Sequence, residues 1–214
     1  MRMCGVIGFN WEDRTLLKKA CDLLNHRGPD QFGYYFDKNI SLGHRRLSII
    51  DLSTKGKQPM SNEDNSIFIT YNGEIYNFQE LREDLEKKGH KFNSNTDTEV
   101  IIHAYEEYGE TCVQKFNGMF AFAIYDSSKK GLFLARDRLG QKPLFYYFKD
   151  NKFFFASEIK AILEDKTIPK DINLTALDSF LTLAYIPYPQ TIFKNIYQLP
   201  PGHVLTYNNK TISI

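Results

Sequence analysis

Long apolar segments are absent from this sequence, and so is a surplus of charge of either sign. No stretch approaches the ~20 apolar residues of a membrane-spanning helix, and the N-terminus lacks the apolar core of a signal peptide. Lysine and arginine total 27 against 26 aspartates and glutamates, a formal charge of +1. Such a balance creates no long-range field that selects nucleic acid or an anionic membrane. We therefore expect a cytoplasmic protein that binds neither.

Cysteine and histidine are also scarce. The three cysteines, Cys4, Cys21 and Cys112, are odd in number and widely spaced, which is neither a disulfide framework nor a zinc-ligand pattern. The five histidines are scattered and include no HExxH pair. The sequence therefore predicts no metal site. Cys21 recurs at helical spacing with apolar neighbours and is expected to be a core residue.

Short β-rich segments separated by turn residues dominate the chain, which is long and apolar enough for one substantial core. Strands are expected over residues 6–9, 32–36, 40–44, 66–71, 119–125, 131–136, 143–148 and 152–156, with a final hairpin about residues 208–209. Helices are expected over residues 16–24, 78–89, 97–108, 157–163 and 174–183. This pattern predicts an α+β domain in which two antiparallel sheets pack face to face with helices outside.

Local signals refine this outline. Asn72-Gly73 follows a β-rich run and predicts a hairpin turn. Asn77 with Glu80 resembles a capping box at a helix start, and Thr96 with Glu99 repeats the pattern. A serine at position 157 is expected to cap the helix that follows it.

Cys4 lies almost at the N-terminus and leads into an apolar run. If Met3 initiates the chain, or if the leader is removed, the thiol and a free α-amino group share one Cα. Because a thiol titrates near pH ~8.5 and an α-amine near ~8, the amine can accept the thiol's proton. This is a nucleophile and its base in one residue. The alternative is that Cys4 is a small hydrophobic residue entering a buried strand.

Several polar residues together fit the opening of a side-chain amide by acyl transfer. Asn72 offers a side-chain NH₂ and Gly73 a backbone N–H to a tetrahedral oxyanion, and the absence of a Cβ at Gly73 lets a substrate approach. Arg46 can hold an α-carboxylate with a two-pronged contact. Asp97 and Glu74 are candidate acceptors for an α-ammonium group.

These residues lie in motifs that resemble the class II glutamine amidotransferase domain, the N-terminal-nucleophile glutaminase half of glutamine-hydrolysing asparagine synthetase. The resemblance covers nearly the whole chain in order. The segment that begins at Arg46 and the run after Ala135 favour the asparagine synthetase branch over the sugar-phosphate and purine branches. The motifs are CGVIG (4–8), NHRGPD (25–30), RLSIID (46–51), NGEIYN (72–77), DTE (97–99), FNGMFAF (116–122), ARDRLG (135–140), SEIKA (157–161) and LPPG (199–202).

The resemblance implies a four-layer αββα N-terminal-nucleophile-hydrolase sandwich and a role for each matching residue. Cys4 is expected to attack glutamine and form a γ-glutamyl thioester, with its α-amine as base through a water. Asn72 and Gly73 are expected to form the oxyanion hole. Glutamine is expected to bind through Arg46 at its α-carboxylate and Asp97 at its α-amino group. The rest of the glutamine pocket is expected to comprise backbone groups of Leu47, Ser48, Ile49, Ile50 and Glu74.

Two departures from the family pattern carry further expectations. Residues 1–3 precede Cys4, so we expect translation to start at Met3 or processing to expose Cys4. The sequence also contains no phosphate-binding glycine loop. We therefore expect residues 4–186 to form the glutaminase core and residues 187–214 a connector toward a missing synthetase domain. ATP and magnesium are expected only in that domain, and no cofactor is expected in this one.

The expected function is hydrolysis of L-glutamine to supply ammonia for ATP-dependent asparagine synthesis from aspartate. The synthetase domain is an expected partner in cis or in trans, and a second copy of the chain is a candidate partner. One alternative delivers the ammonia to another acceptor, such as a cell-surface sugar. Another is a non-catalytic binding relative, which the joint presence of Arg46, Asn72, Gly73 and Asp97 disfavours.

Overall fold

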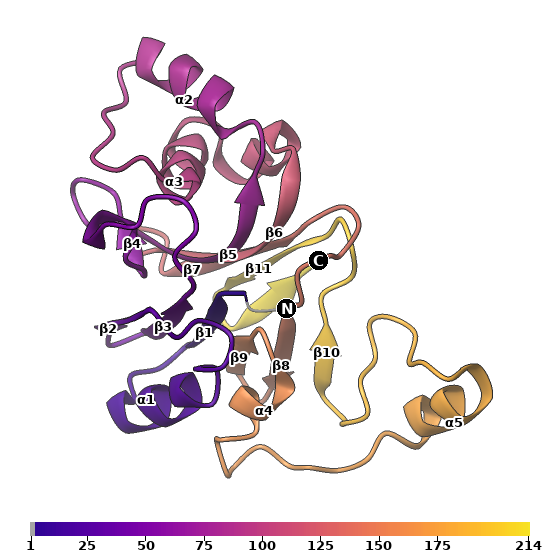
Figure 1. Ribbon diagram of the computed structural model, residues 1–214. Coiled ribbons are helices and arrows are strands. Elements are labelled where there is room, and N and C mark those ends of the chain that lie inside the picture. Colours follow the sequence, from indigo (N-terminus) through magenta and orange to yellow (C-terminus); the bar gives the residue numbers. More distant parts are fainter. Residues whose placement is uncertain (1–2) are drawn as a thin grey trace.

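Two six-stranded antiparallel sheets face each other, and helices cover their outer faces (Figure 1). The computed structural model of the protein describes residues 3–214. The strand orders are β10-β8-β9-β1-β3-β2 in the first sheet and β12-β11-β7-β6-β5-β4 in the second. The predicted α+β sandwich of four layers is confirmed.

The elements lie close to the positions that the sequence predicts. The first sheet contains β10 (Ile196–Gln198), β8 (Phe145–Lys149), β9 (Lys152–Ala156), β1 (Gly5–Phe9), β3 (Ile40–Arg46) and β2 (Gln31–Asp37). The second contains β12 (Thr211–Ser213), β11 (Val204–Asn208), β7 (Gly131–Arg136), β6 (Gly118–Asp126), β5 (Ile67–Ile75) and β4 (Met60–Ser61). The helices are α1 (Arg14–Asp22), α2 (Phe78–Lys87), α3 (Asp97–Tyr108), α4 (Ile159–Ile162) and α5 (Leu174–Leu183), with 3-10 turns η1 (Thr54–Gly56) and η2 (Gly109–Lys115).

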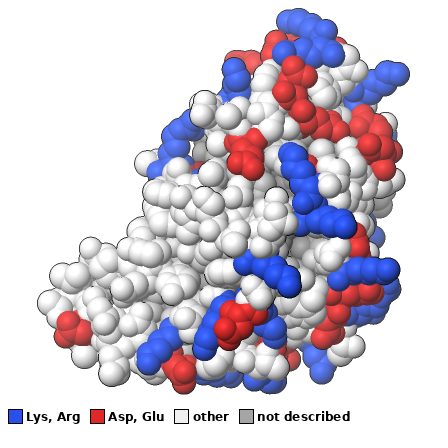
Figure 2. Space-filling model, turned by 180° about the vertical axis from the view of Figure 1, so that it is seen from behind, with Lys and Arg blue, Asp and Glu red and all other residues white. Residues whose placement is uncertain are grey.

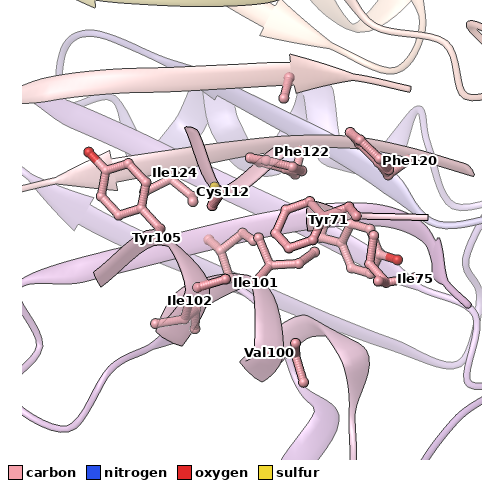
Figure 3. Close-up of a cluster of buried hydrophobic side chains, with 14 of the residues drawn as sticks. Tyr71, Ile75, Val100, Ile101, Ile102, Tyr105, Cys112, Phe120, Phe122 and Ile124 are labelled. Carbon is pink, nitrogen blue, oxygen red and sulfur yellow. The ribbon is translucent and has the colours of Figure 1, made fainter. Parts of the chain in front are cut away.

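Alternating side chains on the central strands build three apolar layers. In β1, Val6 packs between the sheets, whereas Ile7 and Phe9 pack with α1 and α4 on the outer side. In β6, Phe122 packs with α3 and Ala123 packs between the sheets. Figure 3 shows the layer in which side chains of α3 meet those of β5 and β6. A strand buried on both faces explains why this stretch of sequence is apolar throughout.

Two buried polar contacts join the sheets between β3 and β5. Thr70 Oγ1 donates to Gly43 O at 3.0 Å, and His44 Nε2 donates to Tyr71 O at 2.9 Å. Burial lowers the pKa of His44 to about 4, so its ring is neutral at physiological pH. These bonds fix the sheets relative to each other directly beside Asn72.

The predicted hairpin turn at Asn72-Gly73 is wrong, because both residues lie inside β5. They pair with Ala121 and Phe120 of β6. A Cβ on Gly73 would lie 2.2 Å from the carbonyl oxygen of Met119. The glycine is therefore required by the close approach of the neighbouring strand, which a local turn signal does not reveal.

Two predicted helix caps are replaced by tertiary contacts. Asn77 precedes α2 but makes no side-chain cap, and instead its Nδ2 donates to Lys115 O at 3.0 Å while its Oδ1 accepts from Asn117 N at 2.9 Å. Ser157 Oγ accepts from Val6 N at 3.0 Å, which ties the residues before α4 to β1. Both side chains thus hold distant segments rather than their own helix.

The C-terminal segment completes both sheets. β10 pairs with β8 in the first sheet, and β11 pairs with β7 in the second. Leu199 and Leu205 are fully buried. Residues beyond 186 therefore contribute to the core, which differs from the predicted division into a core over 4–186 and a connector over 187–214. A role toward a second domain stays a prediction.

Helix α5 lies apart from the two sheets (Figure 1). Within it only Ala176 is buried, whereas Leu174 and Leu181 are 71% and 75% exposed. Figure 2 shows this lobe, at lower left, with few charged side chains. Exposed apolar surface of this kind is typical of an interaction site. None of the helices in residues 3–214 has the length and apolar character that crossing a bilayer demands.

Arg136 and Asp137 brace the segment that follows β7. The buried guanidinium of Arg136 donates to the carbonyl oxygens of Gly140 at 2.6 Å, Lys142 at 2.8 Å and Leu199 at 2.6 Å. The Asp137 carboxylate accepts backbone N–H groups from four residues: Phe120, Leu139, Gln141 and Lys142. This network fixes residues 137–142 against the second sheet.

We expect Arg136→Met to lower the free energy of unfolding by about 2–4 kcal/mol, because three buried carbonyls lose their donor. Chemical denaturation measures the change. Lys18→Met, on the exposed face of α1, is the control and should stay within about 0.5 kcal/mol of the parent protein. A loss below about 1 kcal/mol for Arg136→Met would contradict the bracing role.

Candidate active site

A cavity opens where the start of β1 meets the ends of β3 and β5 and the first turn of α3. All the site residues that the sequence predicts line it except Ser48, whose backbone N–H donates to Asp30 Oδ2 at 2.8 Å. The lining residues are Met3, Cys4, Arg46, Leu47, Ile49, Ile50, Gly56, Gln58, Tyr71, Asn72, Gly73, Glu74, Thr96, Asp97, Thr98, Met119 and Lys142.

The Cys4 thiol lies on the wall of this cavity. Its Sγ accepts from Leu47 N at 3.4 Å and lies 3.7 Å from Leu47 O. Burial raises the pKa of the thiol, while the Leu47 N–H and the positive charges of Arg46 and Arg27 oppose the rise. Cys4 is therefore a protonated thiol near neutral pH, and its ionisation requires a base.

The loop that contains Arg27 holds Cys4 in place. Arg27 Nε donates to Cys4 O at 3.0 Å, and its Nη1 lies 2.9 Å from Glu158 Oε1. A Cβ on Gly28 would lie 2.4 Å from the carbonyl oxygen of Arg45, so the loop packs tightly on the end of β3. The motif at 25–30 thus positions the start of β1 rather than forming a surface turn.

Asn72 presents a buried amide without a partner. The side chain is 2% exposed, and its Nδ2 has no hydrogen-bond partner within residues 3–214. Buried donors are almost always satisfied, and an orphan costs about 1–3 kcal/mol. Among residues 3–214 the Asn72 Nδ2 group is an unpaired donor, and it lies on the same cavity as Cys4. It can therefore donate to an acceptor on a bound ligand.

Asp97 supplies a buried carboxylate opposite these groups. Its Oδ2 accepts from the Tyr71 hydroxyl at 2.7 Å and from Ile75 N at 3.0 Å. Burial raises the pKa of Asp97, and these two hydrogen bonds oppose the rise. Thr96 Oγ1 accepts from Glu99 N at 3.4 Å, which confirms one half of the predicted capping box, whereas the Glu99 carboxylate accepts from Asn93 N and Ser94 N instead of Thr96 N. The helix therefore fixes the carboxylate at the cavity.

The guanidinium of Arg46 holds the cavity wall. Its Nη1 donates to Gln31 Oε1 at 2.8 Å and to Ser53 O at 3.0 Å, and its Nη2 donates to the carbonyls of Ile50 and Asp51. Both terminal nitrogens thus already donate hydrogen bonds within the chain. They are not available, as they stand, for the two-pronged contact with an α-carboxylate that the sequence predicts. The positive charge still borders the cavity, and Arg46 is only 4% exposed.

Eight lining residues were not predicted as site residues, namely Met3, Gly56, Gln58, Tyr71, Thr96, Thr98, Met119 and Lys142. Gln58 bridges β5 and α3, since its Oε1 accepts from Tyr71 N at 2.7 Å and its Nε2 donates to Thr98 Oγ1 at 3.1 Å. Lys142 follows the motif at 135–140, and the fold of residues 137–142 brings it to the cavity. The motif was the one signal that could have drawn attention to it.

The predicted leader comprises residues 1–3, of which residues 1 and 2 lie outside the described residues, so its removal stays a prediction. Met3 lines the cavity, and its backbone N–H donates to Arg27 O at 3.1 Å.

A second group of ionisable side chains lies on the helical layer. The candidate ligand atoms of His90, His103 and Glu106 lie within 4.8 Å of one another. His103 Nδ1 is 2.7 Å from Glu106 Oε2; burial lowers the pKa of His103, but the Glu106 carboxylate more than offsets this and raises it. The ion pair with Glu106 explains why His103 lies in this cluster.

The chain is similar to known proteins over nearly its whole length. A family model described as "Glutamine amidotransferase domain" matches residues 3–214. The chain is 39% identical to asparagine synthetase [glutamine-hydrolyzing] 3 of Bacillus subtilis (strain 168), over 99% of this chain and 36% of that protein. It is 42% identical to the putative asparagine synthetase [glutamine-hydrolyzing] 2 of Methanocaldococcus jannaschii, over 96% of this chain and 44% of that protein. The chain thus spans less than half the length of these relatives.

Solved structures share the fold. The glutamine phosphoribosylpyrophosphate amidotransferase of B. subtilis, complexed with ADP and GMP, superposes with a TM-score of 0.70 at 19% identity. The match covers 98% of this chain and 48% of that chain. A likeness at this identity supports the sandwich architecture alone.

The Arg27–Glu158 contact generates a pH-dependent prediction. Partial burial raises the pKa of Glu158, but hydrogen bonds from Arg27, Lys160 and His26 outweigh this and lower it from 4.5 to about 2. A lowered pKa stabilises the fold above the unfolded value, and the contribution is lost as pH falls from about 4.5 toward 2. We expect Glu158→Gln to lower Tm near neutral pH, and the difference from the parent to vanish in strong acid.

Thermal unfolding at a series of pH values measures this difference. Glu164→Gln, which breaks only the pair with the exposed Lys166, is the control and should change Tm little at any pH. A Tm difference for Glu158→Gln that is equally large at about pH 7 and about pH 2 would contradict the assignment.

Proposed function

The chain belongs to the family of glutamine amidotransferase domains, and from this premise we propose that it hydrolyses L-glutamine to glutamate and ammonia at the Cys4 cavity. One observation carries the proposal: the Cys4 thiol and the unpartnered Nδ2 of Asn72 border the same cavity. A nucleophile next to a preorganised donor is the arrangement that acyl transfer requires.

The reaction proceeds in two acyl-transfer steps. Cys4 Sγ attacks the carbonyl carbon of the glutamine side chain while its proton passes, through a water, to the α-amine of Cys4. This proton then protonates the leaving nitrogen as the C–N bond breaks, so that ammonia departs and a γ-glutamyl thioester remains. Water attacks the thioester, which releases glutamate and restores the thiol. Because the Cys4 pKa is raised by burial, the amine's participation is necessary.

Asn72 stabilises the oxyanion of both steps. Its Nδ2 has no bond to break before it donates, so the full interaction is available in the transition state. Gly73 follows it in β5 and supplies the second donor through its backbone N–H. A single donor of this kind is worth about 10²–10³ in kcat.

The two ends of the substrate find opposite charges in the cavity. The Asp97 carboxylate receives the α-ammonium group, with Glu74 nearby on the wall. The Arg46 guanidinium receives the α-carboxylate, which takes the place of a carbonyl from the 50–53 segment. Glutamine binding is therefore coupled to displacement of that segment. Leu47, Ile49 and Ile50 form the remaining wall.

The ammonia is used by a synthetase domain that makes asparagine from aspartate, with ATP and magnesium bound in that domain. The names and the greater length of the relatives support this, whether the domain lies in cis or in trans. The exposed apolar face of α5 is consistent with such a partner. No observation favours a sugar as acceptor. The cytoplasmic location and a second copy as partner stay predictions.

The nucleophile is tested with Cys4→Ala. We expect this variant to release no glutamate from glutamine in a coupled assay and to keep the Tm of the parent. Cys112→Ala, which removes a buried thiol in η2 outside the cavity, is the matched control and should retain hydrolysis. Substantial glutamate release by Cys4→Ala would defeat the covalent route. Intact mass must also show an active protein that begins at Cys4.

Asn72→Ala separates catalysis from stability. We expect kcat to fall about 10²–10³-fold because the oxyanion loses a donor. The free energy of unfolding should change by less than about 1 kcal/mol, since Nδ2 makes no hydrogen bond with any part of residues 3–214. Steady-state kinetics and chemical denaturation measure the two quantities. A variant with the parent's kcat would refute the assignment.

A further inference from the structure

Lys142 places a buried cation on the cavity without a carboxylate partner. The side chain is 4% exposed, and its Nζ donates to the sulfur of Met3 at 3.2 Å. A thioether is a weak acceptor. No carboxylate oxygen of residues 3–214 lies within 4.0 Å of this ammonium. Buried lysines are normally paired, so the position calls for a functional explanation.

The backbone around Lys142 is held rigidly. Its N–H donates to the Asp137 carboxylate at 3.0 Å, and its carbonyl accepts from Arg136 Nε at 2.8 Å. The Arg136 guanidinium further holds Gly140 and Leu199. The proposed reaction gives no role to the motif at 135–140. Its contacts therefore have another consequence, which is that they hold Lys142 close to the start of β1.

The ammonium of Lys142 faces the residue that immediately precedes Cys4. In a protein that begins at Cys4, the Met3 thioether is gone and the new α-amino group lies where the peptide bond to Met3 was. Lys142 and Cys4 line the same cavity, and two ammonium groups there repel each other, so the pKa of at least one of them falls. The ordinary pKa values are ~8 for an α-amine and ~10.4 for lysine, so the α-amine is the group that becomes neutral.

We propose that Lys142 is a positioning residue for glutamine hydrolysis: its charge keeps the Cys4 α-amine in the neutral, proton-accepting form near pH ~7. The inference rests on the proposed function, because the amine matters only if Cys4 is the exposed nucleophile. It assigns Lys142 an electrostatic role through the amine and no contact with the reacting atoms.

The other charged groups near the amine lower its pKa less than Lys142 does. Arg27 is paired with Glu158 at 2.9 Å, and Arg46 is surrounded by carbonyl oxygens. Asp97 accepts hydrogen bonds from Tyr71 and Ile75, and its negative charge would raise the pKa of the amine rather than lower it.

Two carboxylates also influence Lys142 itself. Burial lowers the pKa of Lys142, whereas Glu74 and Asp137 counteract that effect. Neither forms an ion pair with it among the described residues. Lys142 is therefore free of a neutralising contact among the described residues.

The test compares kcat/KM for glutamine across pH in protein confirmed by intact mass to begin at Cys4. We expect Lys142→Met to move the acid limb upward by about one pH unit, so that kcat/KM falls about tenfold near pH ~6.5 and recovers near pH ~9. KM should stay similar. Lys142→Arg keeps the charge and should follow the parent profile. Lys129→Met, with an exposed side chain outside the cavity, is the control and should also follow it.

Two kinetic outcomes would overturn the inference. One is an unshifted acid limb in Lys142→Met. The other is equal impairment of Lys142→Arg and Lys142→Met, which would make Lys142 itself the base, since an arginine cannot lose its proton. A parent protein that hydrolyses no glutamine would instead defeat the proposed function.

A direct titration keeps the inference testable if Lys142→Met folds poorly. The α-amine of the parent, labelled with ¹⁵N at Cys4, should titrate below its ordinary ~8 by NMR. A value at or above ~8 in the parent would overturn the inference without any variant.

Discussion

The burial of β1 between β3 and β9 is the constraint on which the site depends. All five residues of this strand are buried, so the chain immediately before it has little freedom. Cys4 is the residue that precedes the strand, and it is further fixed by Arg27 at its carbonyl and Leu47 at its sulfur. A nucleophile at the end of a chain would ordinarily be mobile. Here the centre of a sheet holds it.

The cavity around Cys4 combines satisfied and unsatisfied polar groups. Asp97 and Arg46 are held by hydrogen bonds that set their positions, whereas Asn72 and Lys142 keep donors without a strong acceptor. Structural contacts explain the first pair, because a buried charge needs partners. The second pair stores interactions that only a substrate or a free N-terminus can complete. Asp97 and Arg46 are therefore in place before the substrate binds, whereas Asn72 and Lys142 act only once a substrate or a free N-terminus is present.

Much of the fold follows from local patterns in the sequence. The stretch over 119–125 is apolar on both faces because β6 lies between α3 and the other sheet, and the alternation around β1 and β9 is equally regular. The predictions were wrong where a residue contacts a segment that is distant in the sequence. Gly73 is small because of Met119 on the next strand, and Ser157 bonds to β1 rather than capping α4. Such contacts exist only after the sheets have paired.

The site was predictable where family motifs carry it and not where tertiary structure assembles it. Cys4 and Asn72 were predicted as site residues from the sequence. The position of Lys142 at the cavity was not predictable, because it depends on tertiary hydrogen bonds with Arg136 and Asp137. The proposed reaction requires a thioester between the Cys4 sulfur and the substrate. Rapid acid quenching during glutamine turnover, followed by peptide mass spectrometry, detects that thioester. One glutamyl group is expected on the Cys4 peptide, whereas an adduct on Cys21 or Cys112, or no adduct during active hydrolysis, would refute the covalent route.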